Sequence, residues 1–152
     1  MRPLYTPHTV TIYNIARKTD PDTMAETATL YVTILRGVML QESKGINVRE
    51  SGLQGADAVN LFIPLSVEAV DGITGETKQY VVPHDFWNAA DKSGIWTLSV
   101  DGSSGTTFFV KGENVTDDEA VMHAYGGCYG VTKVDFMNYG SSDMWHWEVG
   151  GV

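Results

Sequence analysis

The sequence predicts a mainly β protein: a small antiparallel β-barrel or sandwich with one or two short helices and a long loop at about residues 41–58. Two observations carry this prediction. About eight segments are rich in β-branched and aromatic residues, and several alternate between apolar and polar positions as half-buried strands do. Helix-forming patterns occupy only two short stretches. Many short strands with little helix are typical of small barrels and sandwiches.

The predicted strands follow one another along the chain, and turn sequences separate some of them. Gly37 lies inside the long second strand and is expected to mark a bulge or sharp bend there. The fifth and sixth strands flank the turn sequence DGSSG, so we expect them to form a hairpin. The sequence VDGITGE is typical of a turn. The predicted strands cover residues 9–15, 28–41, 58–65, 78–83, 95–100, 106–112, 130–137 and 144–150.

Two short segments are predicted to be helical. Residues 83–94 form the first, which Pro83 is expected to open because proline suits the first helical position. Residues 116–127 form the second. Thr116 is expected to cap it, the acidic residues that follow suit the positive end of the helix dipole, and Gly126 is expected to end it.

Length and composition indicate a single globular domain over residues 1–152, with 43 % apolar residues and enough chain for a real core. The net charge of −9 argues against a protein that grips nucleic acid through phosphates. It leaves open a protein past which DNA slides, because an acidic wall repels phosphate. We expect no membrane span, since no apolar run approaches about 20 residues. The N-terminus lacks an apolar signal core, so we expect the protein to stay in the cytosol of the cell that makes it.

The sequence gives little sign of catalytic or metal chemistry. Its histidines have neither the i, i+4 spacing of a helical metal site nor an HExxH motif. Cys128, the single cysteine, lies in YGGCYG without a visible base, so a small buried residue or an inert thiol is the preferred interpretation. Nucleotide-binding and nucleophile-elbow motifs are absent. We therefore expect no enzyme, no cofactor and no metal.

The last predicted strand, MWHWEV, concentrates large side chains. Alternation places Trp145, Trp147 and Val149 on one face, with His146 and Glu148 on the other. A core position is the default interpretation for the apolar face. A contact with a neighbouring subunit is the alternative, and it makes the four residues Trp145, His146, Trp147 and Glu148 a candidate interface. A third possibility is that the four tryptophans of the chain form a stacking platform for a sugar or a base.

Four stretches, in one order, resemble neck proteins of tailed phages and prophages, of the head-closure or stopper type. They are TPHTVTIYNIARKTDPDT, then TLYVTILRGVMLQESKGINVRESGLQGADAVNLFIP, then YVVPHDFWNAADKSGIWTLSVDGSSGTTFFVKG, and finally VTKVDFMNYGSSDMWHWEVGG. The resemblance spans nearly the whole chain. Its most specific parts are ADAVNLFIP and the terminal HWEVGG.

This resemblance implies a structural virion protein, a small β-barrel that forms a ring on the DNA axis in the phage neck. Implied partners are further copies of the chain, with six copies favoured and twelve suiting an adaptor. Others are the portal or adaptor protein above, the tail terminator or tail tube below, and packaged double-stranded DNA in transient contact. The resemblance also implies that the loop at 43–57 gates the channel. Its candidate residues are Lys44, Gly45, Asn47, Arg49, Glu50, Gly52, Gln54, Gly55 and Asp57.

Other functions stay open at the level of sequence. A tail-completion or tail-terminator protein would belong to the same structural class. A β-sandwich that binds carbohydrate through its tryptophans would belong to a different class. The long segment 41–58 is itself ambiguous, since a structureless loop of more than about 12 residues is usually functional or disordered.

Overall fold

The computed structural model describes residues 6–42, 59–100 and 105–152. Within these ranges the chain is mainly β with two short α-helices, as the sequence predicted. The strands are β1 (His8–Thr19), β2 (Glu26–Glu42), β3 (Val59–Pro64), β4 (Glu68–Asp71), β5 (Gln79–Tyr80), β6 (Ile95–Trp96), β7 (Gly105–Lys111), β8 (Cys128–Met137) and β9 (His146–Gly151). The helices are α1 (Pro83–Asn88) and α2 (Glu119–Ala124), with a 3₁₀ helix at Ser142–Met144.

Six strands pair in a closed circuit, in the order β1, β7, β8, β9, β3, β2 and back to β1, and every pairing is antiparallel. A seventh strand, β4, pairs with the middle of β2. Two long strands allow the closure, because each changes partner along its length. β2 pairs with β1 and β4 and then with β3, while β8 pairs first with β7 and then with β9.

The predicted bend in the second strand is confirmed at Gly37. His8 faces Val38 while Thr9 faces Arg36, so Gly37 is an extra residue opposite β1. Its φ angle is +92°, a conformation that favours glycine because side chains strain it. The bulge turns β2 from its pairing with β1 toward its pairing with β3, as bulges bend strands.

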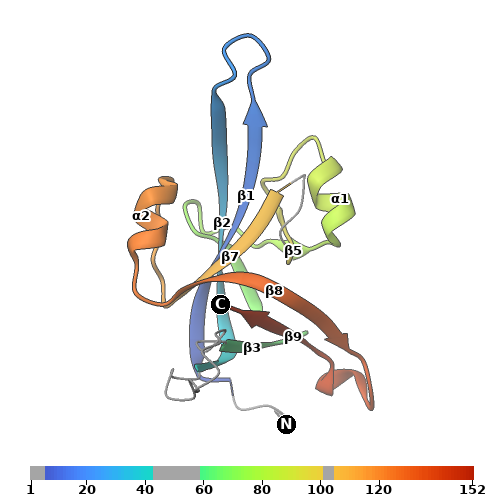
Figure 1. Cartoon of the computed structure of the whole chain (residues 1–152). Coiled ribbons are helices and arrows are strands. Elements are labelled where there is room, and N and C mark those ends of the chain that lie inside the picture. Colours follow the sequence, from blue (N-terminus) through green and yellow to red (C-terminus); the bar gives the residue numbers. More distant parts are fainter. Residues whose placement is uncertain (1–5, 43–58, 101–104) are drawn as a thin grey trace, which may run out of the picture.

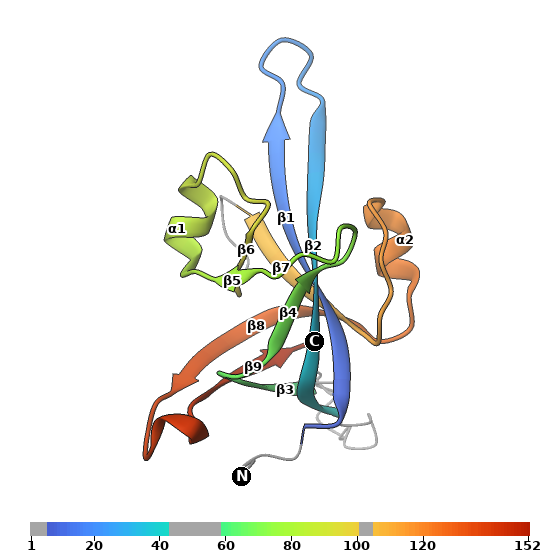
Figure 2. The same cartoon turned by 180° about the vertical axis from the view of Figure 1, so that it is seen from behind.

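Two clusters of buried side chains hold the sheet. Figures 1 and 2 show α1 and α2 on opposite sides of the β1–β2 pair. The larger cluster fills the space within the circuit and includes Ile12, Leu61, Trp96, Phe109 and Trp147. The smaller cluster lies beneath α2 and consists of Tyr13, Ile15, Val32, Val110 and Met122.

The outer part of the β1–β2 hairpin stands clear of the remaining body (Figure 1). We call residues 17–29 the arm, and each of them is exposed. The pairing of β1 with β7 ends at Ala16, and the pairing of β2 with β4 begins only at Thr33. The arm is therefore a two-stranded ladder whose outer edges have no strand beside them within the described residues.

The predicted hairpin of 95–100 with 106–112 is wrong. β7 pairs with β1 on one side and β8 on the other, while β6 pairs in parallel with β5. The segment after β6 is held by a side chain, because the buried Asn14 amide donates to the Thr97 carbonyl at 2.8 Å and its carbonyl accepts from the Thr97 N–H at 3.3 Å. Asn14 thus supplies bonds that a neighbouring strand would make. Within the described residues, hydrogen bonds between this segment and β7 are limited to Thr107, whose N–H donates to the Ser99 carbonyl at 3.3 Å and whose hydroxyl accepts from the Ser99 N–H at 2.9 Å.

Several element boundaries also differ from the prediction. Strand β4 lies partly in the stretch expected to be a turn. The strand predicted over residues 78–83 is observed only at β5, residues 79–80. Helix α1 ends at Asn88. Helix α2 is capped by Asp118, whose carboxylate accepts from the Ala120 N–H at 2.9 Å, and not by Thr116. Asp118 caps the helix because it directly precedes the first helical turn, where a side-chain acceptor reaches the free N–H groups.

Candidate assembly interface

The proposed gating segment lies outside the described residues, but its two anchor points are within them. Glu42, the last residue of β2, is the cross-strand partner of Val59, the first residue of β3. The Lys111 ammonium lies 2.9 Å from the Glu42 carboxylate, which also accepts a hydrogen bond from the Tyr129 hydroxyl. The candidate residues outside the description are Lys44, Gly45, Asn47, Arg49, Glu50, Gly52, Gln54, Gly55 and Asp57.

Trp147 of the last strand belongs to the core. It is 8 % exposed, and its ring centroid lies 4.6 Å from that of Tyr80 and 6.1 Å from that of Trp96. Val149 on the same face of β9 is buried as well. The core interpretation therefore holds for Trp147 and Val149, whereas Trp145, predicted on the same face, is only half-buried.

His146 and Glu148 lie on the opposite face of β9. The His146 Nε2 atom is 3.0 Å from the Glu148 carboxylate, and the Nδ1 atom is 3.0 Å from the carbonyl of Met144. The two side chains thus partner each other along the strand, as the alternation predicted. Across the described ranges no three His, Cys, Asp or Glu side chains gather as a metal would require.

The end of the β8–β9 hairpin exposes a group of large apolar side chains. We call this group, Leu65, Phe136, Tyr139, Met144 and Trp145, the end patch. Four of its members are 42–75 % exposed, and Trp145 is half-buried. The Phe136 and Trp145 rings meet edge to face, 6.1 Å apart. Aromatic residues and methionine are enriched at protein interfaces, so the composition of this patch is that of a contact surface.

Hydrogen bonds to backbone carbonyls fix the end patch in place. The Trp145 indole N–H donates to the Gly140 carbonyl at 3.2 Å, and the Met144 N–H donates to the Ser141 carbonyl at 2.9 Å. On the other side, the Leu65 N–H donates to the Trp145 carbonyl at 3.1 Å. A surface that is already ordered loses less entropy when it binds a partner. The end patch is therefore pre-organised for contact.

Sequence reasoning found Trp145 but missed the other members of the end patch. Phe136 alternates within a strand like any half-buried residue, and Tyr139 and Met144 lie in a polar turn. The β8–β9 ladder and the 3₁₀ helix place these residues at the same end of the hairpin. The one available signal was the density of large side chains around the sequence NYGSSDMW, which a plain turn does not need.

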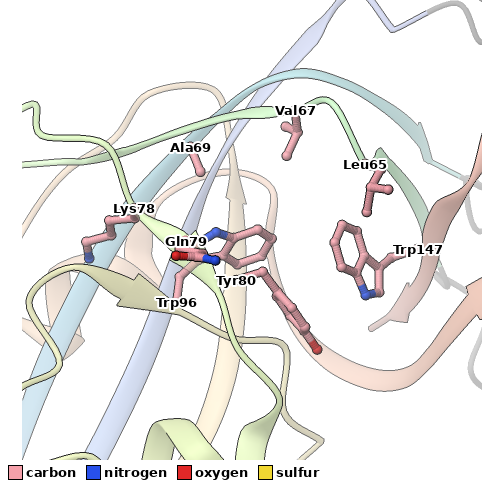
Figure 3. Close-up of a pocket in the computed structure, with 8 residues that line it drawn as sticks. All are labelled: Leu65, Val67, Ala69, Lys78, Gln79, Tyr80, Trp96 and Trp147. Atoms are coloured by element: carbon pink, nitrogen blue, oxygen red, sulfur yellow. The ribbon is translucent and has the colours of Figure 1, made fainter. Parts of the chain in front are cut away.

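A cavity of about 390 Å³ lies beside the end patch (Figure 3). It is lined by Leu65, Val67, Ala69, Lys78, Gln79, Tyr80, Trp96 and Trp147. Its aromatic rings are tilted by 47–75° from one another, and Trp96 is buried. A sugar platform needs exposed rings in one plane, so this arrangement does not favour carbohydrate stacking.

Lys78 lines the cavity with its stem, while its ammonium is directed away from the aromatic rings (Figure 3). The ammonium donates to the Val32 carbonyl and the Thr33 hydroxyl, both at 3.1 Å, and lies 3.4 Å from the Asp71 carboxylate. Burial lowers the pKa of Lys78, and the Asp71 charge opposes this. The cation is thus occupied in holding β2 to the β4 turn.

The remaining reactive groups also serve the fold. Trp87 covers Gly105, where an added Cβ would lie 2.5 Å from the indole. The Trp87 indole N–H donates to the Ser99 hydroxyl at 3.3 Å. Cys128 is half-buried, and burial raises the pKa of its thiol, which disfavours the reactive thiolate.

None of the helices in the described part of the chain has the length and apolarity to cross a membrane.

A closed circuit of antiparallel strands, with a projecting arm and an exposed apolar patch at one end, defines a mainly β protein. The chain belongs to DUF6751, a family of unknown function whose model matches residues 5–152. Neither a curated protein nor a solved structure matches it.

Proposed function

We propose that this protein is a structural component of the neck of a tailed phage. Copies of the chain form a ring below the portal or adaptor protein, close the DNA channel and join head to tail. The observation that carries the proposal is the end patch, a rigid apolar surface at one end of a β body. The resemblance of four sequence stretches to head-closure proteins supplies the biological setting.

The end patch supports assembly because its exposure costs free energy in water. Burying apolar surface yields about 25 cal/mol per Å². A monomer gains nothing from holding Phe136, Tyr139 and Met144 exposed beside Trp145, whereas a partner that covers them gains from all four. In a ring, this partner is the neighbouring subunit, or the portal or tail protein that docks on the ring.

The charge of the chain suits a channel wall. A net charge of −9 on each copy repels phosphate, so DNA that passes through the ring finds little to hold it. The same charge makes the copies repel one another, and salt screens this repulsion over about 8 Å at physiological ionic strength. We therefore expect assembly to strengthen as salt concentration rises.

The gating role of segment 43–57 has a direct test. The residues that flank this segment are joined by β2–β3 pairing and by the contacts of Glu42, so deleting residues 45–55 should leave the body folded. The deletion should abolish DNA retention in the head. The matched control for loop length replaces residues 45–55 with a glycine–serine linker of the same length. Retention by the shortened protein contradicts the gate.

The first experiment is disruption of the gene in its phage, with negative-stain microscopy and measurement of capsid DNA. Emptied heads beside free, complete tails support a stopper. Full heads beside unattached tails assign the protein to the tail side, as a tail-completion or terminator protein. Intact, infectious virions overturn the neck proposal. Complementation with Met144→Ser, compared with Val121→Ser at a similarly exposed position outside the patch, then tests the end patch itself, and equal function of the two variants would contradict its role.

A further inference from the structure

The turn that joins β1 to β2 presents a large apolar side chain at the end of the arm. Met24 lies in this turn, and it is 73 % exposed. The arm stands clear of the remaining body in both views (Figures 1 and 2), so the body of its own chain does not cover the turn. Met24 gains free energy from burial only when another molecule covers it.

The backbone at Met24 is also unfavourable for the residue that occupies it. Its φ of +61° lies in the left-handed region, and within the described ranges no other residue except glycine has a positive φ. Glycine would adopt this conformation without strain. The Met24 N–H donates to the Asp20 carbonyl at 2.7 Å, and the Asp20 N–H donates to the Ala25 carbonyl at 2.8 Å, which holds the turn. A strained position that carries an exposed apolar side chain destabilises the free chain, so we look for its role in a complex.

The arm that carries Met24 is held in one direction. At its base, the Arg17 guanidinium forms two hydrogen bonds with the Glu119 carboxylate of α2, at 2.9 and 2.6 Å. The hydrogen bonds within the turn fix the other end of the arm. A contact residue that is already positioned loses less entropy when it binds. The turn is therefore pre-organised to present Met24.

The cavity beside the end patch has the chemistry to receive this side chain. Two rows of side chains face each other across it (Figure 3), the aliphatic Leu65, Val67 and Ala69 and the aromatic Tyr80, Trp96 and Trp147. Lys78 is the one charged residue in the described lining, and its ammonium is bonded elsewhere. An uncharged occupant is therefore favoured. Methionine is unbranched, adapts to irregular spaces and makes favourable contacts between its sulfur and aromatic rings.

We propose that the end of the arm of one copy binds in the cavity of the next copy, with the Met24 side chain between the two rows. This inference rests on the proposed ring. The arm is directed away from β4, β5 and β9, which contribute to the cavity of its own chain, so the contact joins two chains (Figure 2). A surface side chain that fits a pocket elsewhere on the same molecule makes a head-to-tail contact, which closes into a ring when the rotation permits.

The cavity and the end patch are continuous, which supports a single neighbour for both. Leu65 belongs to the end patch and also lines the cavity. The cavity volume of about 390 Å³ lies near the lower end of the range for ligand pockets, about 300–1,000 Å³. Side chains that fill pockets at the centre of an interface carry most of its binding energy. Met24 would be such an anchor, and the end patch would surround it.

Replacing Met24 by glycine separates assembly from stability. Met24→Gly removes both the side chain and the backbone strain, so the urea midpoint should not fall. The concentration needed for assembly, measured by sedimentation velocity, should rise about ten-fold or more. Met24→Leu keeps an apolar side chain and should assemble nearly as the wild type does. Ile73→Ser is the matched control, because Ile73 is 72 % exposed and lies outside the arm and the described cavity lining, and it should leave assembly unchanged.

Cysteines on separate chains test where the end of the arm binds. In a Cys128→Ala background, one chain carries Met24→Cys and a second carries Gln79→Cys, at an exposed residue that lines the cavity. Mild oxidation of the mixture should give a disulfide between unlike chains. Each variant alone should give about ten-fold less, because a disulfide needs Cα atoms within about 7 Å of each other.

The outcomes separate this contact from the ring itself. If wild-type protein forms rings, Met24→Gly assembles normally and the mixture gives no disulfide, the contact is wrong and the ring stands. A strong disulfide in Met24→Cys alone means that two arms meet end to end, which overturns binding in the cavity. If wild-type protein stays monomeric and no disulfide forms, the ring and the contact are both wrong.

Discussion

Replacing Trp147 and Trp145 separately by alanine tests whether two indoles two residues apart have different roles. Trp147 is 8 % exposed and packs on Tyr80 and Phe136, with centroid distances of 4.6 and 5.4 Å. Truncating a buried tryptophan costs about 3–5 kcal/mol, because transfer free energy is lost and a cavity remains. Trp145 is half-buried and keeps one hydrogen bond, so its truncation should cost less than about 1 kcal/mol.

Urea denaturation followed by far-ultraviolet circular dichroism measures both costs without relying on tryptophan fluorescence. With a slope of about 2 kcal/mol per molar urea, Trp147→Ala should lower the midpoint by about 1.5–2.5 M. Trp145→Ala should lower it by less than about 0.5 M and should weaken assembly instead. An equal fall in both midpoints would refute the division of the last strand into a core face and a contact surface.

Three further predictions concern stability, each measured by urea denaturation. Gly37→Ala should lower the free energy of unfolding by about 1–2 kcal/mol, because a side chain strains the backbone at a φ of +92°. Gly94→Ala should lower it less, although an added Cβ meets no atom within 4 Å at either position. The hydrogen bonds from Arg17 lower the pKa of Glu119. The free energy of unfolding of the wild type should therefore exceed that of Glu119→Gln by about 0.5–1 kcal/mol above pH 5, and this difference should disappear as pH falls below about 4. Asp71→Asn should cost about 3 kcal/mol by leaving Lys78 buried without its counter-charge, and Lys78→Met should cost less; the reverse order would contradict this account.

Local patterns in the sequence predicted the parts of the fold that depend on local physics. The alternation in the second strand and the glycine inside it were enough to predict the bend at Gly37. The alternation of the last strand placed Trp147 and Val149 on one face and the His146–Glu148 pair on the other. These features follow from the period of the strand and from the conformational range of glycine, and both can be read from adjacent residues.

Pairings between distant segments could not be predicted in the same way. The failed hairpin at 95–112 depended on Asn14, whose amide bonds to Thr97 across more than half the chain. The arm escaped prediction because a strand exposed on both faces has no apolar alternation, and residues 17–19 are all polar. The end patch was found only at Trp145, since exposure depends on how β8 and β9 close the turn between them.

The closed circuit of strands has a consequence for how the protein is made. β9 bonds to both β3 and β8, so these two strands keep open edges on the ribosome until the last strand has emerged. β1 likewise waits for β7, since Thr11 pairs with Val110. Folding dominated by such distant pairings is slow. A chain halted before His146 would leave two unpaired edges ready to aggregate, so the circuit is protected only once β9 has emerged and paired.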